Sequence, residues 1–174
     1  FVLMRTITVA LGEKTYNIEI AAGLLDQIGA KARVLSQAVK AAIISDSNVD
    51  PLYGERLERS LAASGFEVTR IVFAAGEQSK NLTVLGQVYD ELARAGLTRS
   101  DLILTLGGGV PGDLGGFAAA TFLRGIDFIQ VPTSLLAQID SSVGGKVAID
   151  LPSGKNLAGS FYQPKAVFID PDLL

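Results

Sequence analysis

The chain has 174 residues, of which 48% are hydrophobic, and its 15 basic and 18 acidic residues give a net charge of −3. These values fit one globular domain with a substantial core, and the lack of a basic cluster argues against nucleic-acid binding. The apolar runs are too short to span a membrane, so we expect no membrane partner and a cytoplasmic location, which the lack of cysteine also favours. Histidine is absent too, so the chain alone cannot form an ordinary zinc site, and proton transfer requires Lys, Asp, Glu, Tyr or a substrate group.

The first predicted element is a β-hairpin, because residues 5–11 and 15–20 alternate in polarity on either side of a short turn. After it, strands and helices alternate. Helices are predicted over 24–35, from Pro51 to near Gly65, from about 84 to near Gly96, over 114–121 and over 134–142. Strands are predicted over 41–45, 67–73, 102–106, 127–131, 146–150 and 166–169. This order predicts a Rossmann-like α/β fold, a mostly parallel sheet with helices on both faces, preceded by the N-terminal β-hairpin.

Polar or glycine-rich turns follow four of the predicted strands. They contain Asp46 and Asn48, then Glu77 and Lys80, then a glycine loop, and finally Thr133 and Ser134. Ligands of parallel α/β sheets bind at the carboxyl ends of the strands. We therefore expect these four turns to form one ligand-binding cleft.

The glycine loop is the most informative of these turns. It runs from Gly107 to Asp113 and matches G-x-G-x-x-G at Gly107, Gly109 and Gly112. A strand that leads through glycines into a helix can hold a phosphate, because the backbone approaches the anion closely and the helix start supplies unpaired N–H donors. Taken alone, the match leaves a plain tight turn almost as plausible. A classical Rossmann fold would also place the loop after the first strand.

Four blocks in fixed order carry a resemblance to a known family. They are Gly107 to Asp113 with Gly116 to Ala120, Arg124-Gly125 leading to Gln130 to Leu136, Asp140 to Lys146, and Gly154 to Leu157 with Phe161 to Pro164. Together they resemble 3-dehydroquinate synthase, a shikimate-pathway enzyme family, and the similarity runs from about Asp46 to the C-terminus. Four ordered motifs are far more specific than one glycine loop.

The resemblance implies an NAD- and metal-dependent lyase of chorismate and aromatic amino acid biosynthesis. It would convert a phosphorylated keto acid, 3-deoxy-D-arabino-heptulosonate 7-phosphate, into 3-dehydroquinate with elimination of phosphate. In this family the N-terminal α/β domain binds NAD, and a helical C-terminal domain supplies a Glu and two His to the metal, zinc or cobalt. We therefore expect residues 1–174 to be the NAD-binding N-terminal domain of a longer enzyme, able to bind NAD but inactive alone.

The resemblance also assigns the cofactor residues. It places Asp46 and Asn48 beside the nucleotide, Glu77 and Lys80 on its adenosine side, Gly108, Gly109 and Gly112 at the pyrophosphate, Asp113 at the nicotinamide ribose, and Thr133 with Ser134 after the next strand. A carboxylate that accepts ribose hydroxyls is physically sensible. The structural alternatives are a helix-capping turn for Asp46 and Asn48, a solvated charge for Glu77, a helix-start acid for Asp113 and an N-cap for Ser134.

The implied substrate residues are Arg124, Asp140, Lys146, Lys155 and Asn156. A substrate with a phosphate and a carboxylate needs cations and forked donors, which Lys and Arg supply. In the family, the arginine at position 124 reaches the substrate of the neighbouring subunit, which implies a homodimer. The alternatives are a salt-bridged strand entry for the Asp140–Lys146 pair and an ordinary surface charge for Arg124. No residue is an obvious general base, which fits a mechanism in which the substrate's own phosphate accepts the proton.

Two other functions remain open. Sugar-phosphate cyclases and metal-dependent polyol dehydrogenases share the NAD domain, although we expect cyclases with other products to differ from this chain between Asp140 and Lys146. A stand-alone, non-catalytic nucleotide-binding domain is the alternative from a different class.

Overall fold

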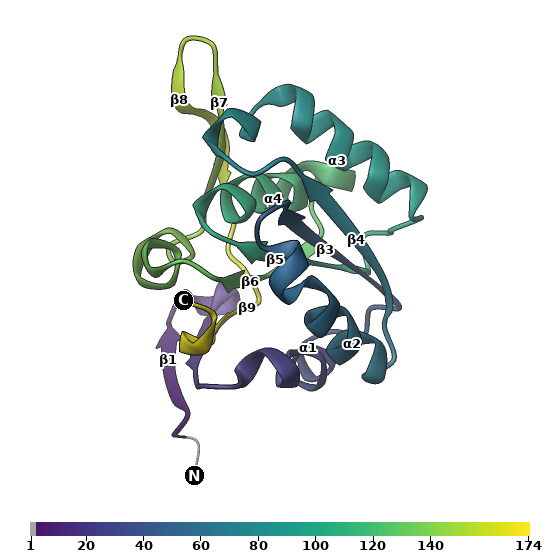
Figure 1. The fold of residues 1–174 in the computed structure, drawn as a ribbon, viewed down its shortest axis with the longest axis vertical. Coiled ribbons are helices and arrows are strands. Elements are labelled where there is room, and N and C mark those ends of the chain that lie inside the picture. The colour runs from purple at the N-terminus through teal and green to yellow at the C-terminus, as the bar shows by residue number, and fades with distance from the viewer. Residues whose placement is uncertain (1–2) are drawn as a thin grey trace.

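One seven-stranded sheet forms the centre of the molecule, and a two-stranded hairpin lies outside it (Figure 1). The strands are β1 (Arg5–Val9), β2 (Tyr16–Ile20), β3 (Lys40–Asp46), β4 (Glu67–Phe73), β5 (Leu102–Gly107), β6 (Asp127–Pro132), β7 (Lys146–Leu151), β8 (Gly154–Phe161) and β9 (Ala166–Ile169). This computed structural model describes residues 3–174. The order in the large sheet is β1-β2-β9-β6-β5-β3-β4, and only β1 runs antiparallel to its neighbour.

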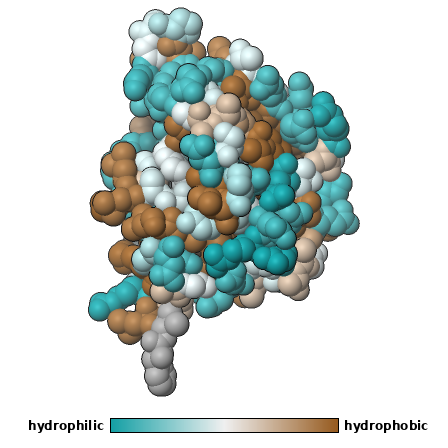
Figure 2. All heavy atoms as spheres, viewed as in Figure 1, coloured by the Kyte–Doolittle hydropathy of each residue, from teal (hydrophilic) through white to brown (hydrophobic). Residues whose placement is uncertain are grey.

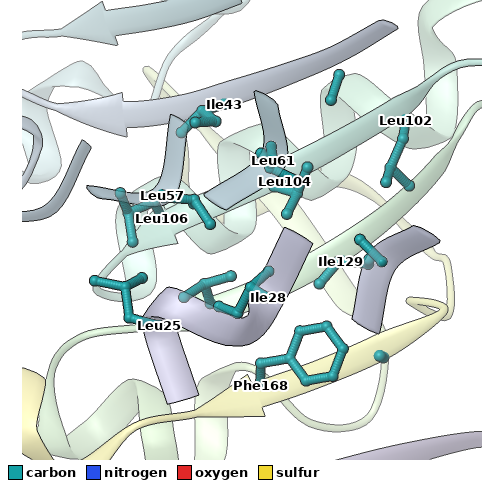
Figure 3. Close-up of a cluster of buried hydrophobic side chains, with 14 of the residues drawn as sticks. Leu25, Ile28, Ile43, Leu57, Leu61, Leu102, Leu104, Leu106, Ile129 and Phe168 are labelled. Carbon is teal, nitrogen blue, oxygen red and sulfur yellow. The ribbon is translucent and has the colours of Figure 1, made fainter. Parts of the chain in front are cut away.

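Helices cover both faces of this sheet. The four longest are α1 (Ile28–Leu35), α2 (Glu55–Ala63), α3 (Leu82–Arg94) and α4 (Gly109–Thr121). Successive side chains of a strand point to opposite faces, so Ala41 and Ile43 of β3 join the core with α1 and α2, whereas Ala42 and Ile44 join the core with α3 and α4. Figure 3 shows the first of these cores. The predicted Rossmann-like fold is therefore confirmed.

The predicted N-terminal hairpin is confirmed as well. Strands β1 and β2 pair antiparallel, and β2 joins the sheet beside β9. Tyr16 and Ile18 are buried against Val167 and Ile169 in a third, smaller core. The hairpin is thus an integral edge of the sheet.

The structure differs from the sequence-based expectations at three places. The strand predicted over 146–150 exists as β7, but it lies outside the main sheet and pairs with β8, which was not predicted. Helix α4 begins at Gly109, five residues before the predicted start at Leu114. The segment predicted as a helix over 134–142 contains a π-helical turn, η6 (Ala137–Ser141), in place of a regular α-helix.

Exposed apolar side chains gather on the segment that follows β6. Leu135 is 60% exposed, Leu136 67% and Ile139 70%. Figure 2 shows apolar atoms protruding over this segment at the left edge of the view. Among residues 3–174, no helix is both long enough and apolar enough to cross a membrane.

Asp101, which precedes β5, hydrogen-bonds to the first residue of β3, and its loss should destabilise the domain. This buried carboxylate accepts hydrogen bonds from Lys40 N at 2.8 Å, Thr98 N at 2.8 Å and Thr98 Oγ1 at 3.0 Å. Burial disfavours the charged form, but these hydrogen bonds outweigh it and lower the pKa of Asp101. An Asp101→Ala variant leaves two backbone donors unpaired and should lose about 2–4 kcal/mol of unfolding free energy in urea titrations at pH 7.

The unfolding free energy lost in Asp101→Ala should depend on pH, because the Asp101 carboxyl titrates. Because the folded-state pKa lies below the unfolded value of about 4, the stabilisation is present above that value and disappears as the pH falls through the folded pKa. The parent and Asp101→Ala should therefore differ less at pH 3 than at pH 7. Asp127→Ala removes a half-exposed carboxylate paired only with Lys165, and should change stability by no more than about 0.5 kcal/mol. A difference of the same size at both pH values would contradict the assignment.

Candidate functional site

The glycine loop connects the carboxyl end of β5 to the start of α4. No side chain caps the first turn of α4, whose N-cap is Gly108. Such a helix start has free N–H donors and a partial positive charge, which together suit an anion. An alanine Cβ at Gly109 would meet only Ser141 Oγ, at 3.6 Å, so the backbone is open on this side. The loop therefore has free donors and open space for an anionic group.

The other glycines of this block are needed for packing. A Cβ at Gly112 would lie 2.9 Å from Gln130 Oε1. A Cβ at Gly115 would lie 2.6 Å from Thr105 Cγ2, and one at Gly116 would lie 2.3 Å from Val147 Cγ1. These three positions let α4 approach the sheet and β7 closely, so Gly112 has a structural role whether or not it also approaches a ligand.

A cavity of about 490 Å³ lies beside the start of α4. Four of the predicted site residues line it together, namely Asp113 from α4, Asp140 from η6, Lys146 from β7 and Asn156 from β8. The remaining lining residues are Ser141, Val147, Ala148, Leu157, Gly159, Ser160 and Phe161. One cation, two carboxylates and an amide thus face the same space, as a ligand with hydroxyl and anionic groups requires.

Lys80 is the centre of a buried ionic cluster next to this cavity. Its ammonium lies 3.0 Å from Asp113 Oδ2, 2.7 Å from Asn156 Oδ1, 3.4 Å from Glu77 Oε1 and 3.8 Å from Asp150 Oδ1. We call these five residues the Lys80 cluster. Lys80 is only 4% exposed, so its charge depends on these partners for compensation. The resemblance had placed Glu77 and Lys80 at the adenosine end of NAD and Asp113 at the nicotinamide end. In the structure these three residues belong to one cluster.

Electrostatic effects within the cluster oppose one another. Burial would lower the pKa of Lys80, but the hydrogen bond and charge of Asp113, with the charges of Glu77 and Asp150, raise it above its ordinary value. Burial also raises the pKa of Asp113, and Lys80 offsets this only in part. The backbone N–H of Asn156 lowers the pKa of Asp150. Lys80 therefore stays protonated, and the pKa values of Asp113 and Asp150 move in opposite directions.

Several predicted cofactor residues also have structural roles. Asp46 Oδ1 accepts from Asn48 N at 2.9 Å and Val49 N at 3.0 Å, which is the turn-capping arrangement. Ser134 Oγ accepts from Ala137 N at 3.3 Å, as an N-cap does. Thr133 is buried, and its N–H donates to Gly107 O. All four predicted turns lie at the carboxyl ends of their strands. Of the site residues predicted in these turns, Asp113 alone lines the cavity.

Arg124 and Lys155 lie outside the cavity. Arg124 follows the far end of α4, a helix of 13 residues and therefore about 20 Å long, whereas Asp113 lies near its start. The backbones of Leu123 and Arg124 are both left-handed, with φ of 53° and 65°, a strained conformation for residues other than glycine. The side chain of Lys155 is 73% exposed and lies 3.6 Å from Glu77 Oε1.

Comparison with known proteins identifies the family. Residues 70–174 match the family model described as 3-dehydroquinate synthase N-terminal. The chain belongs to the 3-dehydroquinate synthase family. It is 57% identical over 97% of its length to the 3-dehydroquinate synthase of Clostridium acetobutylicum, and 51% identical over 99% of its length to that of Caulobacter vibrioides, and it covers 47% of each. The chain thus spans about half the length of these curated 3-dehydroquinate synthases.

Two solved structures of related enzymes resemble the chain closely. A 2-deoxy-scyllo-inosose synthase complexed with carbaglucose-6-phosphate, NAD⁺ and Co²⁺ matches 98% of this chain with a TM-score of 0.90 and 30% identity, over 47% of that chain. ValA, a 2-epi-5-epi-valiolone synthase from Streptomyces hygroscopicus with NAD⁺ and Zn²⁺ bound, matches 95% with a TM-score of 0.82 and 30% identity, over 45% of that chain. The glycerol dehydrogenase of Schizosaccharomyces pombe, at 24% identity and a TM-score of 0.68, shares the fold.

Sequence reasoning missed part of this candidate site. Asp150 joins the Lys80 cluster, and Leu157, Ser160 and Phe161 of β8 line the cavity. The signal that could have revealed them is the Pro152-Ser153-Gly154 turn, which a hairpin would explain. Within residues 3–174, no group of three or more His, Cys, Asp or Glu side chains is arranged to hold a metal ion.

Proposed function

We propose that this chain is the NAD-binding N-terminal domain of a 3-dehydroquinate synthase acting on 3-deoxy-D-arabino-heptulosonate 7-phosphate in the cytoplasm. The observation that carries the proposal is the uncapped start of α4 beside a cavity lined by Asp113, Asp140, Lys146 and Asn156. The family membership supports it, and 57% identity to a 3-dehydroquinate synthase against 30% to cyclases with other products favours this reaction over theirs.

NAD bound here would accept and return a hydride on the substrate. The residues of this chain would bind and orient the cofactor and the substrate. The amides at the start of α4 would hold the pyrophosphate, and Asp113, which lines the cavity, would accept a hydrogen bond from a ribose hydroxyl. Lys146 supplies a positive charge for a substrate anion, while Asp140 and Asn156 accept or donate hydrogen bonds to hydroxyl groups. This positions the substrate so that its own phosphate can accept a proton.

A second domain and a second subunit belong to the same proposal. The metal would be held by residues outside this chain, and the exposed Leu135, Leu136 and Ile139, next to cavity residue Asp140, supply an apolar surface for that domain to cover. Arg124 is separated from its own cavity by the length of α4, so if it binds the substrate phosphate it does so in a homodimer, on the neighbouring copy. The isolated chain would then bind NAD without catalysing the reaction.

Calorimetric titration of NAD into the 174-residue chain tests the proposal. The chain should bind NAD, and a variant that combines Asp113→Ala with Lys80→Ala should bind it at least about tenfold more weakly, because hydrogen bonds to a charged group are lost. The double variant removes both members of the Lys80–Asp113 ion pair, so neither of these two charges is left without the other. A folded chain that takes up no NAD would contradict the NAD assignment, and product formation by the isolated chain with added metal would contradict its inactivity.

A further inference from the structure

The β7–β8 hairpin, which projects from the top of the molecule in Figure 1, packs against the rest of the domain through β7, whereas β8 is attached less extensively. It is not hydrogen-bonded to the seven-stranded sheet. Val147 and Ile149 of β7 pack into the core with α3 and α4, but β8 is exposed along most of its length, and Phe161 is 82% exposed. A two-stranded hairpin alone is at best marginally stable in water. The position of β7 is set by this apolar packing, whereas the exposed β8 and the turn between the strands depend on polar contacts.

Lys80, Asp150 and Asn156 form a closed ring of hydrogen bonds. The backbone oxygen of Lys80 accepts from Asp150 N at 2.9 Å, Asp150 Oδ1 accepts from Asn156 N at 2.8 Å, and the Lys80 ammonium donates to Asn156 Oδ1 at 2.7 Å. The same ammonium donates to Asp113 at 3.0 Å. One side chain thereby joins the loop after β4, the start of α4 and both strands of the hairpin.

We propose that Lys80 is a positioning residue that holds the β7–β8 hairpin against α4 and so sets the shape of the candidate cavity. Lys80 does not line the cavity, whereas its partners Asp113 and Asn156 do. Its charge also compensates three carboxylates, those of Glu77, Asp113 and Asp150, which would otherwise repel one another. The consequence for a ligand rests on the proposed function, but the attachment of the hairpin can be measured without any ligand.

The backbone of Asn156 allows a clean test. Its φ is 55°, in the left-handed region that Asn tolerates and Gly adopts freely. Asn156→Gly therefore keeps the backbone conformation and removes the side-chain amide, which contacts Lys80 and lines the cavity. Lys80→Met removes the charge at similar length, and Lys165→Met is a matched control, because Lys165 is half-exposed and pairs only with Asp127, away from the cluster.

Amide hydrogen exchange of the ligand-free chain, followed by NMR, measures the attachment. In Lys80→Met and Asn156→Gly the hairpin amides, above all those of Asp150 and Asn156, should exchange at least about tenfold faster than in the parent and in Lys165→Met. The amides of β5 should keep their protection. Hairpin protection equal to that of the parent in Asn156→Gly would overturn the proposal. If Lys80→Met loses protection throughout the domain, Asn156→Gly alone decides.

The pH dependence separates an electrostatic clamp from a steric contact. In Lys80→Met the charged groups that face one another are Glu77, Asp113, Asp150 and, at the rim, Lys155. Burial raises the pKa of the Asp113 carboxyl, and in the variant Lys80 no longer offsets this effect, so protonation of Asp113 as the pH falls should return part of the hairpin's protection between pH 8 and pH 5, after correction for intrinsic exchange rates. A loss of protection that is the same at both pH values would contradict the charge-based role.

NAD titration of the same variants links the clamp to the cavity. A parent chain that does not bind NAD would contradict the proposed function and leave the exchange result standing. If the parent binds NAD and Asn156→Gly releases the hairpin yet binds NAD equally well, the positioning role is wrong while the proposed function holds.

Discussion

Gly109→Ala should weaken NAD binding by about 100-fold while leaving the free energy of unfolding within about 1 kcal/mol of the parent. The added methyl group would meet only Ser141 Oγ at 3.6 Å, an ordinary contact, and alanine is favourable near a helix start. The fold should therefore tolerate it. A pyrophosphate bound at the start of α4 would not, because the methyl group points toward cavity residue Ser141 and prevents close approach of the backbone.

Calorimetry with NAD and urea unfolding check the two halves of this prediction on the same samples. Gly86→Ala is the control, since a Cβ at Gly86 in α3 has open space around it. It should bind NAD as the parent does and gain about 0.5–1 kcal/mol of stability. An unchanged dissociation constant in Gly109→Ala would mean that the glycine loop is only a turn.

Gly29→Ala should destabilise the domain by about 3–5 kcal/mol, the largest stability effect we expect from a single methyl group. A Cβ at Gly29 in α1 would lie 1.8 Å from Ser60 O in α2, and a backbone oxygen cannot move aside as a side chain can. The two helices would have to separate. The hydrogen bond from Gly29 N to Ser60 Oγ, at 2.9 Å, would be lost with that contact.

Circular dichroism during urea titration measures this effect, and binding provides a second check. The α1–α2 crossing lies on the opposite face of the sheet from α4, so a Gly29→Ala chain that is still folded should bind NAD with nearly the parent affinity. Stability within about 1 kcal/mol of the parent would show that the helices can separate at little cost.

The main sheet could be predicted because its strands are short apolar runs between glycine-ended helices. Gly65 and Gly96, which mark the predicted helix ends, adopt left-handed backbones in the structure, with φ of 89° and 73°. Local chemistry and tertiary position agree there. The start of α4 was predicted five residues late because a glycine run has low helix propensity, and burial against the sheet overrides that preference.

The second hairpin strand is the clearest failure of sequence reasoning. Residues 154–161 contain two glycines, an asparagine and no regular alternation, and the strand is exposed on most of its length. Nothing in a pattern of burial could reveal it. The contacts of Lys80 with Asp150 and Asn156 were missed for the same reason, although Asn156 itself was named, because both residues meet that side chain only when the hairpin lies against α4.

The family resemblance named a set of site residues, but it could not predict which of them share one cavity. Four of them line one cavity, and Lys80 supports them from behind. That division follows from distances that the order of motifs along the chain does not contain.

The pairing of β2 with β9 has a consequence for the order of events on the ribosome. Ile18 pairs with Val167, so the first hairpin to leave the exit tunnel finds its place only after nearly all of the domain has been synthesised. Until then β1 and β2 are an unanchored ribbon with open edges and exposed side chains such as Ile7. The last strand, β9, therefore completes the sheet by pairing with both β2 and β6. A nascent chain stalled before Ala166 exposes unpaired strand edges that can aggregate or bind chaperones.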